Sequence, residues 1–222
     1  MTVRGDDLSA LYSERFKARE RERKLAVWRV LCRHFFQRYV RPEDTVLDLG
    51  AGHCEFINTI RCREKIAVDG NPKVRRWAGE GVRVVLATSV HLAEVGDASV
   101  DVVFCSNFLE HLPDKTALHE TLAECRRVLR QGGRLLVLQP NIRAVGGRYW
   151  DFIDHHLPLT ERSLVEALVM AGLAPREVRA RFLPYTTKSA LPQHPLLVRL
   201  YLLLRPVHRL LGGQSWLVAE KG

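Results

Sequence analysis

A glycine-rich turn in the first third of the chain has the residue types of a ligand-binding site. Residues 46–56 read VLDLGAGHCEF, an apolar run with one acid, Asp48, that breaks at Gly50 and Gly52 before a segment able to begin a helix. A strand that turns into a helix in this way brings backbone N–H groups and the positive end of the helix up to a ligand. Glycine allows the positive φ angles and the close approach that such contact needs. The alternative is a strand-to-helix turn that uses its glycines for conformation only.

An acid follows at the distance where a nucleotide-binding unit places one. The apolar run over residues 65–68 ends in Asp69, roughly 20 residues beyond the turn, where a carboxylate accepts hydrogen bonds from the hydroxyls of a ribose. The alternative interpretation is a solvated acid that opens the turn at Gly70. The pattern therefore predicts a site for a ligand that carries a ribose, with Asp69 as the residue that binds it.

Three histidines are candidates for proton transfer, because imidazole is the usual base near neutral pH. His111 follows an apolar run, and His155 and His156 are adjacent in a loop that also holds aromatic side chains, arginines and acids. Such a mixture suits substrate binding. A metal site made from the adjacent pair with Asp151 or Asp154 is disfavoured, since adjacent side chains diverge in most backbones, and no metal is expected. The remaining alternative is a loop held in place by histidines that bond to their neighbours.

The elements that would position these residues alternate between strand and helix. Near-continuous runs of Val, Leu and Phe are typical of parallel strands buried on both faces, and an amphipathic helix over residues 115–129 separates the last two. This alternation predicts an α/β fold with a doubly wound sheet whose ligands bind at the carboxyl ends of the strands. Residues 131–133 (QGG) are expected to form a structural turn. The expected strands in this region are 46–49, 65–68, 82–87, 100–105 and 135–139.

Helices are predicted before this region, and a helix and two strands after it. Residues 8–40 carry apolar side chains at three- and four-residue intervals, which predicts two helices or one bent helix. Within them, residues 17–24 (KARERERK) favour a solvated helical face. Thr160 is the predicted N-cap of a later helix. A strand over residues 176–183 and a last strand over residues 216–219 follow.

An insertion over residues 185–213 separates the last two predicted strands. Its segment 196–211 (LLVRLYLLLRPVHRLL) is very apolar, but arginines and a proline interrupt it and it is too short to span a bilayer. We consider three roles for it: a helix that covers the active site or forms a homodimer face, a basic amphipathic contact with a membrane surface, and plain core. The membrane contact would suit a lipid-linked substrate.

Composition sets broad limits on the protein class. The chain has 222 residues, of which 46% are hydrophobic, enough for one domain of ordinary size with a substantial core. A formal net charge of +9 permits an anionic partner such as nucleic acid, a phosphorylated substrate or a membrane surface. The five cysteines are odd in number and lack C-x-x-C spacing, and the start of the chain lacks a secretory pattern. We therefore expect a cytoplasmic protein, with peripheral membrane contact as the variant.

The order of these motifs resembles that of the class I S-adenosylmethionine-dependent methyltransferases. The resemblance rests on the glycine turn, on Asp69, on residues 99–114 (SVDVVFCSNFLEHLPD) and on residues 127–141 (RVLRQGGRLLVLQPN), and it covers residues 45–173. One departure is Cys54, which stands where the family often has a third glycine. The resemblance implies a Rossmann-like methyltransferase fold: a mostly parallel seven-stranded sheet with N-terminal helices, a helical insertion before the last strand, and an antiparallel final pair.

The resemblance also implies which residues bind the cofactor, S-adenosylmethionine. Asp69 would accept hydrogen bonds from the ribose, and Asn107 would lie at the methionine end. Thr88 or Ser89 would bind the adenine amine, unless their hydroxyls cap the next segment. The predicted cofactor-binding residues are Asp48, Gly50, Gly52, Asp69, Gly70, Thr88, Ser89 and Asn107.

The implied chemistry makes modest demands on side chains. Because the sulfonium already activates its methyl group, the protein must mainly hold the acceptor in line and exclude water. A hydroxyl or protonated amine acceptor also needs a base, and the predicted catalytic residues are His111, His155 and His156. The expected reaction is methyl transfer to an O, N or C nucleophile of a small or lipid-linked molecule, such as a sugar or secondary metabolite.

Two other functions are open at this point. Methylation of RNA or other nucleic acid is disfavoured, because residues 106–109 (SNFL) replace the Asp/Asn-Pro-Pro-aromatic motif of base methylases. A catalytically inactive nucleotide-binding regulatory module on the same fold is the second alternative. The predicted organisation is a single domain over residues 1–222, made of a helical lid (1–41), a core (45–184), a helical insertion (185–213) and the last strand (214–222).

Overall fold

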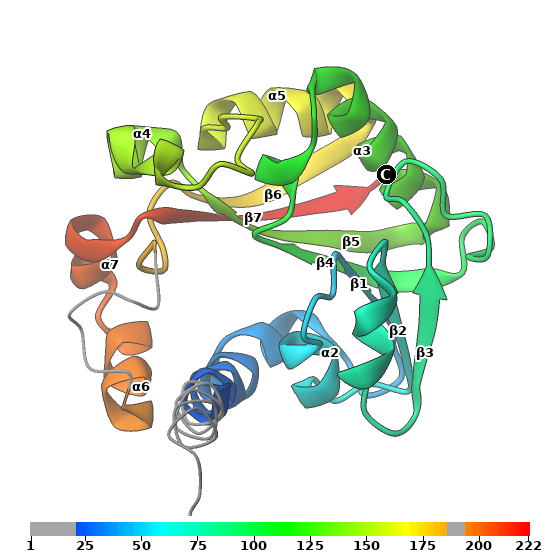
Figure 1. Ribbon diagram of the computed structural model, residues 1–222, viewed down its shortest axis with the longest axis horizontal. Helices are drawn as coiled ribbons and strands as arrows, with labels where there is room; N and C mark the ends of the chain where they lie inside the picture. The colour runs from blue at the N-terminus through cyan, green and yellow to red at the C-terminus, as the bar shows by residue number, and fades with distance from the viewer. Residues whose placement is uncertain (1–20, 186–193) are drawn as a thin grey trace, which may run out of the picture.

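One seven-stranded sheet runs through the molecule in the computed structural model, which describes residues 21–185 and 194–222 (Figure 1). The strand order is β3-β2-β1-β4-β5-β7-β6. Neighbouring strands from β3 to β5 are parallel, and β7 pairs antiparallel with both β5 and β6. The chain reverses its direction of winding between β1 and β4, so the carboxyl ends of these two strands border a crevice. The strands are β1 (Thr45–Leu49), β2 (Glu64–Asp69), β3 (Val82–Leu86), β4 (Val100–Ser106), β5 (Leu129–Pro140), β6 (Leu173–Arg179) and β7 (Gln214–Lys221).

Helices cover both faces of this sheet (Figure 1). Helices α3 and α5 lie over one face, and the helix over residues 21–34 lies with α2 over the other, while α6 and α7 stand beside the sheet. The helices are 21–34, α2 (Glu55–Thr59), α3 (Lys115–Val128), α4 (Ile142–Val145), α5 (Glu161–Met170), α6 (Pro195–Leu203) and α7 (Arg205–Leu211). Four short 3-10 helices are η1 (Phe36–Tyr39), η2 (Pro72–Arg76), η3 (Leu109–His111) and η4 (Gly146–Asp151).

Alternate side chains of each central strand build two separate cores. In β4, Val103 belongs to the core under α3 and α5, whereas the next residue, Phe104, belongs to the core under helix 21–34. Phe104 stacks there on Phe56 of α2, with the ring centroids 3.7 Å apart. Both faces of the strands are therefore buried, which is why their sequences are continuously apolar.

The predicted fold is confirmed, with boundaries that shift where the strand pairing is irregular. The turn predicted at residues 131–133 is a bulge inside β5, because Gly132 adopts a φ of +73° and the register with β4 shifts there. The sixth strand, predicted over residues 176–183, begins three residues earlier and ends four residues earlier, since the chain bends after β6 and brings the Phe182 N–H onto the Gln214 carbonyl at 2.7 Å. Thr160 caps α5 as predicted, in a reciprocal capping box with Ser163.

Parts of the predicted helical segments lie outside the described residues. This applies to the apolar positions between residues 8 and 16 and to residues 186–193 of the insertion. The described part of the insertion forms α6 and α7, and residues 21–34 form one helix followed by η1. Across the described parts of the chain, every helix is too short or too polar to cross a bilayer.

Candidate active site

The glycine turn between β1 and α2 is held in a left-handed conformation. Gly50 has a φ of +71° and Gly52 a φ of +51°, and the N–H of Gly50 bonds to the Val68 carbonyl at 2.9 Å. A Cβ on Gly50 would lie 2.4 Å from the ring of Phe108, whereas one on Gly52 would meet nothing closer than 4.0 Å. Gly50 is therefore required by packing as well as by φ, and Gly52 by φ alone. Cys54, the N-cap of α2, also adopts a left-handed conformation, with a φ of +59°.

Asp69 closes this turn from the end of β2. One carboxylate oxygen accepts a hydrogen bond from the Gly52 N–H at 2.8 Å, and the other accepts one from the Asn71 N–H at 2.7 Å. Each carboxylate oxygen has a second lone pair, so Asp69 can accept further hydrogen bonds from a ligand. Asp69 thus holds the turn in place and can still accept hydrogen bonds from a ligand bound beside the turn.

Asp48 lies buried next to the turn, on the side that faces helix 21–34. Burial raises the pKa of its carboxyl to about 8, and the negative charges of Glu55 and Asp69 act in the same direction. At neutral pH the protonated, uncharged form is therefore favoured. A protonated carboxyl can donate a hydrogen bond, which an ionised one cannot.

A cavity of about 900 Å³ opens beside the glycine turn. Its inner end is lined by the turn, by Asn107 and by the polar groups that follow β4 and β5. Its outer end is apolar and lies between helix 21–34, α6 and α7. The apolar lining there includes Val27, Trp28, Leu31, Leu183, Leu197, Val198, Leu200, Leu204, Val207 and Leu211.

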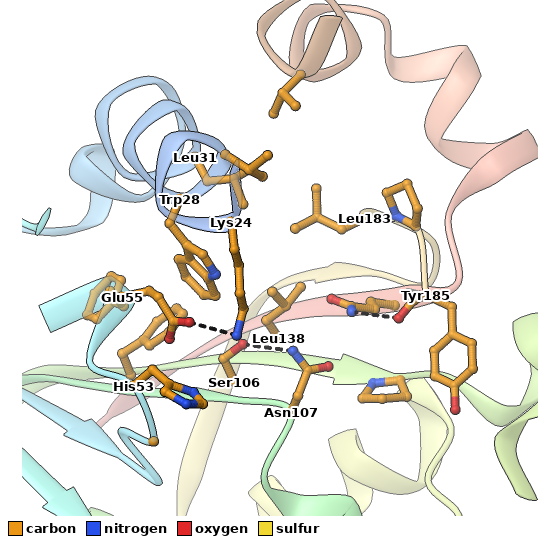
Figure 2. Close-up of a pocket in the computed structure, with 18 of the residues that line it drawn as sticks. Lys24, Trp28, Leu31, His53, Glu55, Ser106, Asn107, Leu138, Leu183 and Tyr185 are labelled. Carbon is orange, nitrogen blue, oxygen red and sulfur yellow. Dashed lines mark hydrogen bonds and ion pairs between the residues drawn. The ribbon is translucent and has the colours of Figure 1, made fainter. Parts of the chain in front are cut away.

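An ion pair crosses the cavity near the turn. Figure 2 shows Lys24 reaching from helix 21–34 to Glu55 of α2, with Trp28 beside it and Ser106 and Asn107 below. The Lys24 ammonium lies 2.7 Å from a Glu55 carboxylate oxygen, and the Glu55 side chain is only 10% exposed. Of the segment 17–24 predicted to form a solvated face, residues 21–23 are exposed, whereas Lys24 lines the cavity and residues 17–20 lie outside the described residues.

A cluster of three titratable side chains forms one wall of the inner end. His111 of η3 has its Nδ1 2.9 Å from the backbone carbonyl of Asp154 and 3.3 Å from the Asp154 carboxylate. Its Nε2 lies 4.0 Å from an oxygen of Glu110, and its ring centroid lies 5.1 Å from that of His155. Glu110, His111 and His155 all line the cavity. The structure therefore brings together two of the three predicted histidines, with an acid between them.

Burial perturbs two members of this cluster. It raises the pKa of the Glu110 carboxyl to about 7, although the neighbouring His111 opposes the shift. It also lowers the pKa of His155, and the charge of His111 adds to that effect. Within the described residues, one Glu110 carboxylate oxygen and the Nδ1 of His155 are buried without a hydrogen-bond partner. Buried polar atoms without partners are rare in proteins, so this wall is a candidate for binding a polar group.

Other predicted site residues lie away from the cavity. His156 is exposed, and only its backbone N–H is engaged, with the Glu110 carbonyl at 2.8 Å. Ser89 is buried, and its hydroxyl pairs with that of Thr121 on α3 at 2.7 Å. Gly70 and Thr88 are exposed beyond the carboxyl ends of β2 and β3. Of the predicted cofactor-binding residues, the cavity is lined by Asp48, Gly50, Gly52 and Asn107, whereas Asp69 contacts the turn through the Gly52 N–H without lining the cavity itself.

Three charged residues of the cavity were not predicted from the sequence: Lys24, Glu55 and Glu110. Glu110 had a usable signal, since it is a lone acid next to the predicted base His111 and lies four residues after a buried strand. Glu55 begins a helix after a glycine turn, where an acid is usually explained by the helix dipole. Lys24 lies in a mixed-charge segment and gives no sign of its partner, which is distant in the sequence.

Comparisons with known proteins agree with this arrangement. Residues 47–137 match a family model described as a methyltransferase domain. Over 100 residues the chain is 37% identical to a probable S-adenosylmethionine-dependent methyltransferase of Mycobacterium tuberculosis, covering 43% of this chain and 35% of that protein. It is also 27% identical over 154 residues to an uncharacterized 37.1 kDa protein in transposon TN4556 of Streptomyces fradiae, covering 62% of this chain and 41% of that one. The chain thus spans well under half the length of these relatives.

The fold of the given residues has counterparts among solved structures. A chain of the complex between the Haloferax volcanii Trm112 methyltransferase activator and a methyltransferase superposes with a TM-score of 0.66 at 20% identity, covering 99% of both chains. At this level of identity the likeness concerns the fold alone.

Proposed function

We propose, on the premise that this chain belongs to the class I S-adenosylmethionine-dependent methyltransferase family, that it methylates a small or lipid-linked acceptor. The observation that carries the proposal is the shape of the cavity, which joins the glycine turn and the polar cluster to an apolar chamber. Ligand pockets typically measure about 300–1,000 Å³. At about 900 Å³ this one is large enough for a cofactor and an acceptor side by side.

S-adenosylmethionine, the cofactor of this family, would lie across the glycine turn. Its ribose hydroxyls would bond to Asp69, which keeps free acceptor sites on both oxygens. Lys24 and Glu55 present opposite charges beside the turn, matching the carboxylate and ammonium of the methionine end. Asn107 lines the cavity between them and the polar cluster. When bound, the cofactor supplies an electrophilic methyl group, and the residues of the chain position the acceptor toward it.

The acceptor would lie with a polar group at the Glu110–His111–His155 cluster and an apolar part between the helices. The chamber between helix 21–34, α6 and α7 presents mostly aliphatic side chains, so burial of hydrocarbon would stabilise the complex by about 0.8 kcal/mol per CH₂ group. Such a chamber would stabilise a bound sugar or nucleic-acid base only slightly, but would bind a hydrocarbon chain or ring much more favourably. We therefore favour an acceptor with a substantial apolar part.

His111 is the best placed base. Its Nδ1 faces the carbonyl of Asp154, so the Nδ1–H tautomer is favoured and Nε2 is left as a proton acceptor. Its side chain is 35% exposed and faces the cavity, whereas His155 is buried and His156 points outside. His155 and Asp154 would act by holding the ring of His111 in place.

Calorimetric titration of the full chain with S-adenosylmethionine tests the cofactor part of the proposal. We expect one molecule to bind, and Asp69→Ala to weaken binding at least 10-fold, because two hydrogen bonds to a charged group are lost. Asp151→Ala is the matched control, since Asp151 is an exposed carboxylate of η4, whereas Asp69 bonds to the glycine turn. Absence of heat and of thermal protection at saturating cofactor would end the methyltransferase proposal and favour a regulatory module that binds another nucleotide.

Transfer of a radiolabelled methyl group into fractionated cell extract tests the acceptor class. We expect the label in material that partitions into organic solvent, and a 10²–10⁴-fold lower rate for His111→Ala, the usual contribution of a base. His119→Ala on α3, outside the cavity, is the control. Unchanged turnover in His111→Ala, His155→Ala and His156→Ala would refute the base assignment. Label recovered in RNA would instead support the nucleic-acid alternative, which the net charge of +9 permits.

We further propose that α6 and α7 rest on an anionic membrane surface. Leucines on these helices form two rows: one lines the cavity, and the other, made of Leu196, Leu203 and Leu210, lies outside it and is 66–78% exposed. The exposed cations Arg199, Arg205 and Arg209 are interspersed with this outer row. Apolar side chains flanked by arginine suit the boundary between acyl chains and anionic headgroups. A lipid-linked acceptor could then enter the chamber from the bilayer.

Vesicle flotation tests this contact. The full chain should float with vesicles that contain anionic lipid and not with neutral ones, and the triple substitution of Leu196, Leu203 and Leu210 by Ser should abolish flotation. Val169→Ser with Met170→Ser on α5 is the matched control, because these side chains are also exposed. Flotation that survives the triple substitution, or a concentration-dependent homodimer that the same substitution dissociates, would contradict the membrane contact.

A further inference from the structure

We propose that Glu110, His111 and His155 form a binding site for a divalent transition-metal ion on the inner wall of the cavity. Each residue offers one ligand atom, and these atoms all lie within 4.8 Å of one another. The residues come from two segments, η3 after β4 and the loop after η4, and all three line the cavity. The site is thus built from elements distant in sequence and remains open to a ligand.

The unpaired atoms of the cluster point to a missing ligand. Glu110 is 1% exposed and His155 is 8% exposed, yet among residues 21–185 and 194–222 the Nδ1 of His155 has no hydrogen-bond partner, and one carboxylate oxygen of Glu110 has only the side chain of Gln139 near it. A buried carboxylate and a buried imidazole nitrogen are costly to leave unpaired. A cation bound between them would satisfy both atoms at once.

The surroundings hold the ligands in the manner of a metal site. The Nδ1 of His111 faces the Asp154 carbonyl at 2.9 Å, which favours the tautomer whose Nε2 is free to bind an ion. The backbone carbonyl of Glu110 accepts hydrogen bonds from the N–H groups of His156 and Leu157, at 2.8 and 3.0 Å. These bonds tie the two segments together, so the three ligands are positioned by the fold and not by one another.

The geometry fits a small ion after a modest closure. Ligand atoms bound to zinc at about 2.1 Å are roughly 3.4 Å apart in a tetrahedral site. The His111 Nε2 and the Glu110 Oε1 are 4.0 Å apart, and the three ligand atoms lie within 4.8 Å of one another, so pairs of them need to approach by roughly 0.6–1.4 Å. Two imidazoles and one carboxylate favour zinc, iron, cobalt or manganese over magnesium or calcium, which prefer oxygen ligands. Three protein ligands leave a position open toward the cavity.

Metal binding at this site does not depend on the proposed function, but its role in methyl transfer does. At the open position the ion would bind an oxygen of the acceptor and lower the pKa of its hydroxyl, whose proton would pass to water at the cavity mouth. The ionised oxygen would then form its bond to the methyl carbon as the bond to sulfur breaks. In the loaded protein His111 serves as a ligand, whereas in the metal-free protein its Nε2 is available as the base.

Calorimetry and the visible spectrum of cobalt test the site without any methyl transfer. The full chain, freed of metal by a chelator, is titrated with Zn²⁺ and separately with Co²⁺, in the absence of cofactor. We expect one equivalent to bind per chain, with the intense visible absorption of four- or five-coordinate cobalt. Glu110→Gln and His155→Gln should each weaken binding more than 100-fold, whereas His119→Gln on α3 should not change it.

Crystals soaked in Zn²⁺ give a second measurement that needs no variant to fold. An anomalous difference peak within about 2.5 Å of all three ligand atoms supports the site. A lack of binding by the wild-type chain, or equal binding by Glu110→Gln that melts as the wild type does, overturns it. Because both assays omit S-adenosylmethionine, their failure is distinct from a failure of the methyltransferase proposal, which the cofactor titration decides.

Discussion

Replacing Asp48 by Asn should make the protein more stable, and increasingly so as the pH rises. Burial raises the pKa of Asp48 to about 8, and the charges of Glu55 and Asp69 add to the effect, whereas the ordinary pKa of an aspartate side chain is 3.8. Between these two values the folded state retains a proton that the unfolded state has lost. Stability therefore falls as the pH rises through this interval and levels off above the folded-state value.

The size of the effect follows from the same two values. A difference of one bound proton changes the free energy of unfolding by about 1.4 kcal/mol per pH unit. Between pH 6 and pH 8, allowing for partial ionisation near the upper end, the wild-type chain should lose about 2 kcal/mol through Asp48. Asparagine has nearly the same shape and does not titrate. The stability advantage of Asp48→Asn over the wild type should therefore grow by about 2 kcal/mol over this range.

Urea unfolding of the cofactor-free chain at pH 6, 7 and 8 measures this difference. Burial also raises the pKa of Glu110, to about 7, but Glu110 is present in both proteins and its contribution cancels. Asp151→Asn, which removes an exposed carboxyl, controls for the loss of one charge. A free-energy difference between Asp48→Asn and the wild type that stays constant from pH 6 to pH 8 would refute the reasoning from burial.

Two further substitutions test local features of the fold. Gly50→Ala should lower the free energy of thermal or urea unfolding by at least 3 kcal/mol, because the new Cβ would lie 2.4 Å from the Phe108 ring and alanine would also be held at a left-handed φ. Gly52→Ala should lower it by about 1–2 kcal/mol, because only the left-handed φ opposes the substitution there. Equal losses would show that the Phe108 ring moves aside freely. Thr160→Ala should lower the free energy of unfolding by about 1 kcal/mol, since it removes the cap bonded to the Ser163 N–H at 3.0 Å. An unchanged urea midpoint would mean that water replaces this cap.

The sheet was predictable because its signals are local. Each parallel strand is a continuous apolar run, and the two cores on its faces account for this, as Val103 and Phe104 illustrate. The errors fell where backbone geometry decides: Gly132 turns the predicted loop into a bulge, and the bend before Phe182 ends β6 early. Neither event changes hydrophobicity, so the pattern of residue types could not reveal it.

The candidate site was predictable only as far as strand ends define it. Asp69 lies beside the glycine turn because β1 and β2 are neighbouring parallel strands, and that much follows from topology. The approach of Lys24 to Glu55 depends on how helix 21–34 packs over the sheet, which no local pattern encodes. For Ser89 the sequence predicted the place in the chain but not the direction of the side chain. Ser89 follows β3 as expected, but its hydroxyl bonds to that of Thr121 instead of facing the cavity.

The polar cluster and the apolar chamber together predict how an acceptor is oriented. β4 and β5 are adjacent and parallel, so the segments that follow them leave the sheet at the same edge, and the Glu110 carbonyl then binds the N–H groups of His156 and Leu157. The insertion before β7 brings α6 and α7 to the same cavity from the other side. Glu110 and His155 of the polar cluster are buried, and the apolar lining belongs in part to helices whose outer leucines are exposed. To reach the cluster, an acceptor that enters from a lipid surface would have to point its polar group away from the bilayer. This requirement favours acceptors whose reactive group is carried on a long apolar chain.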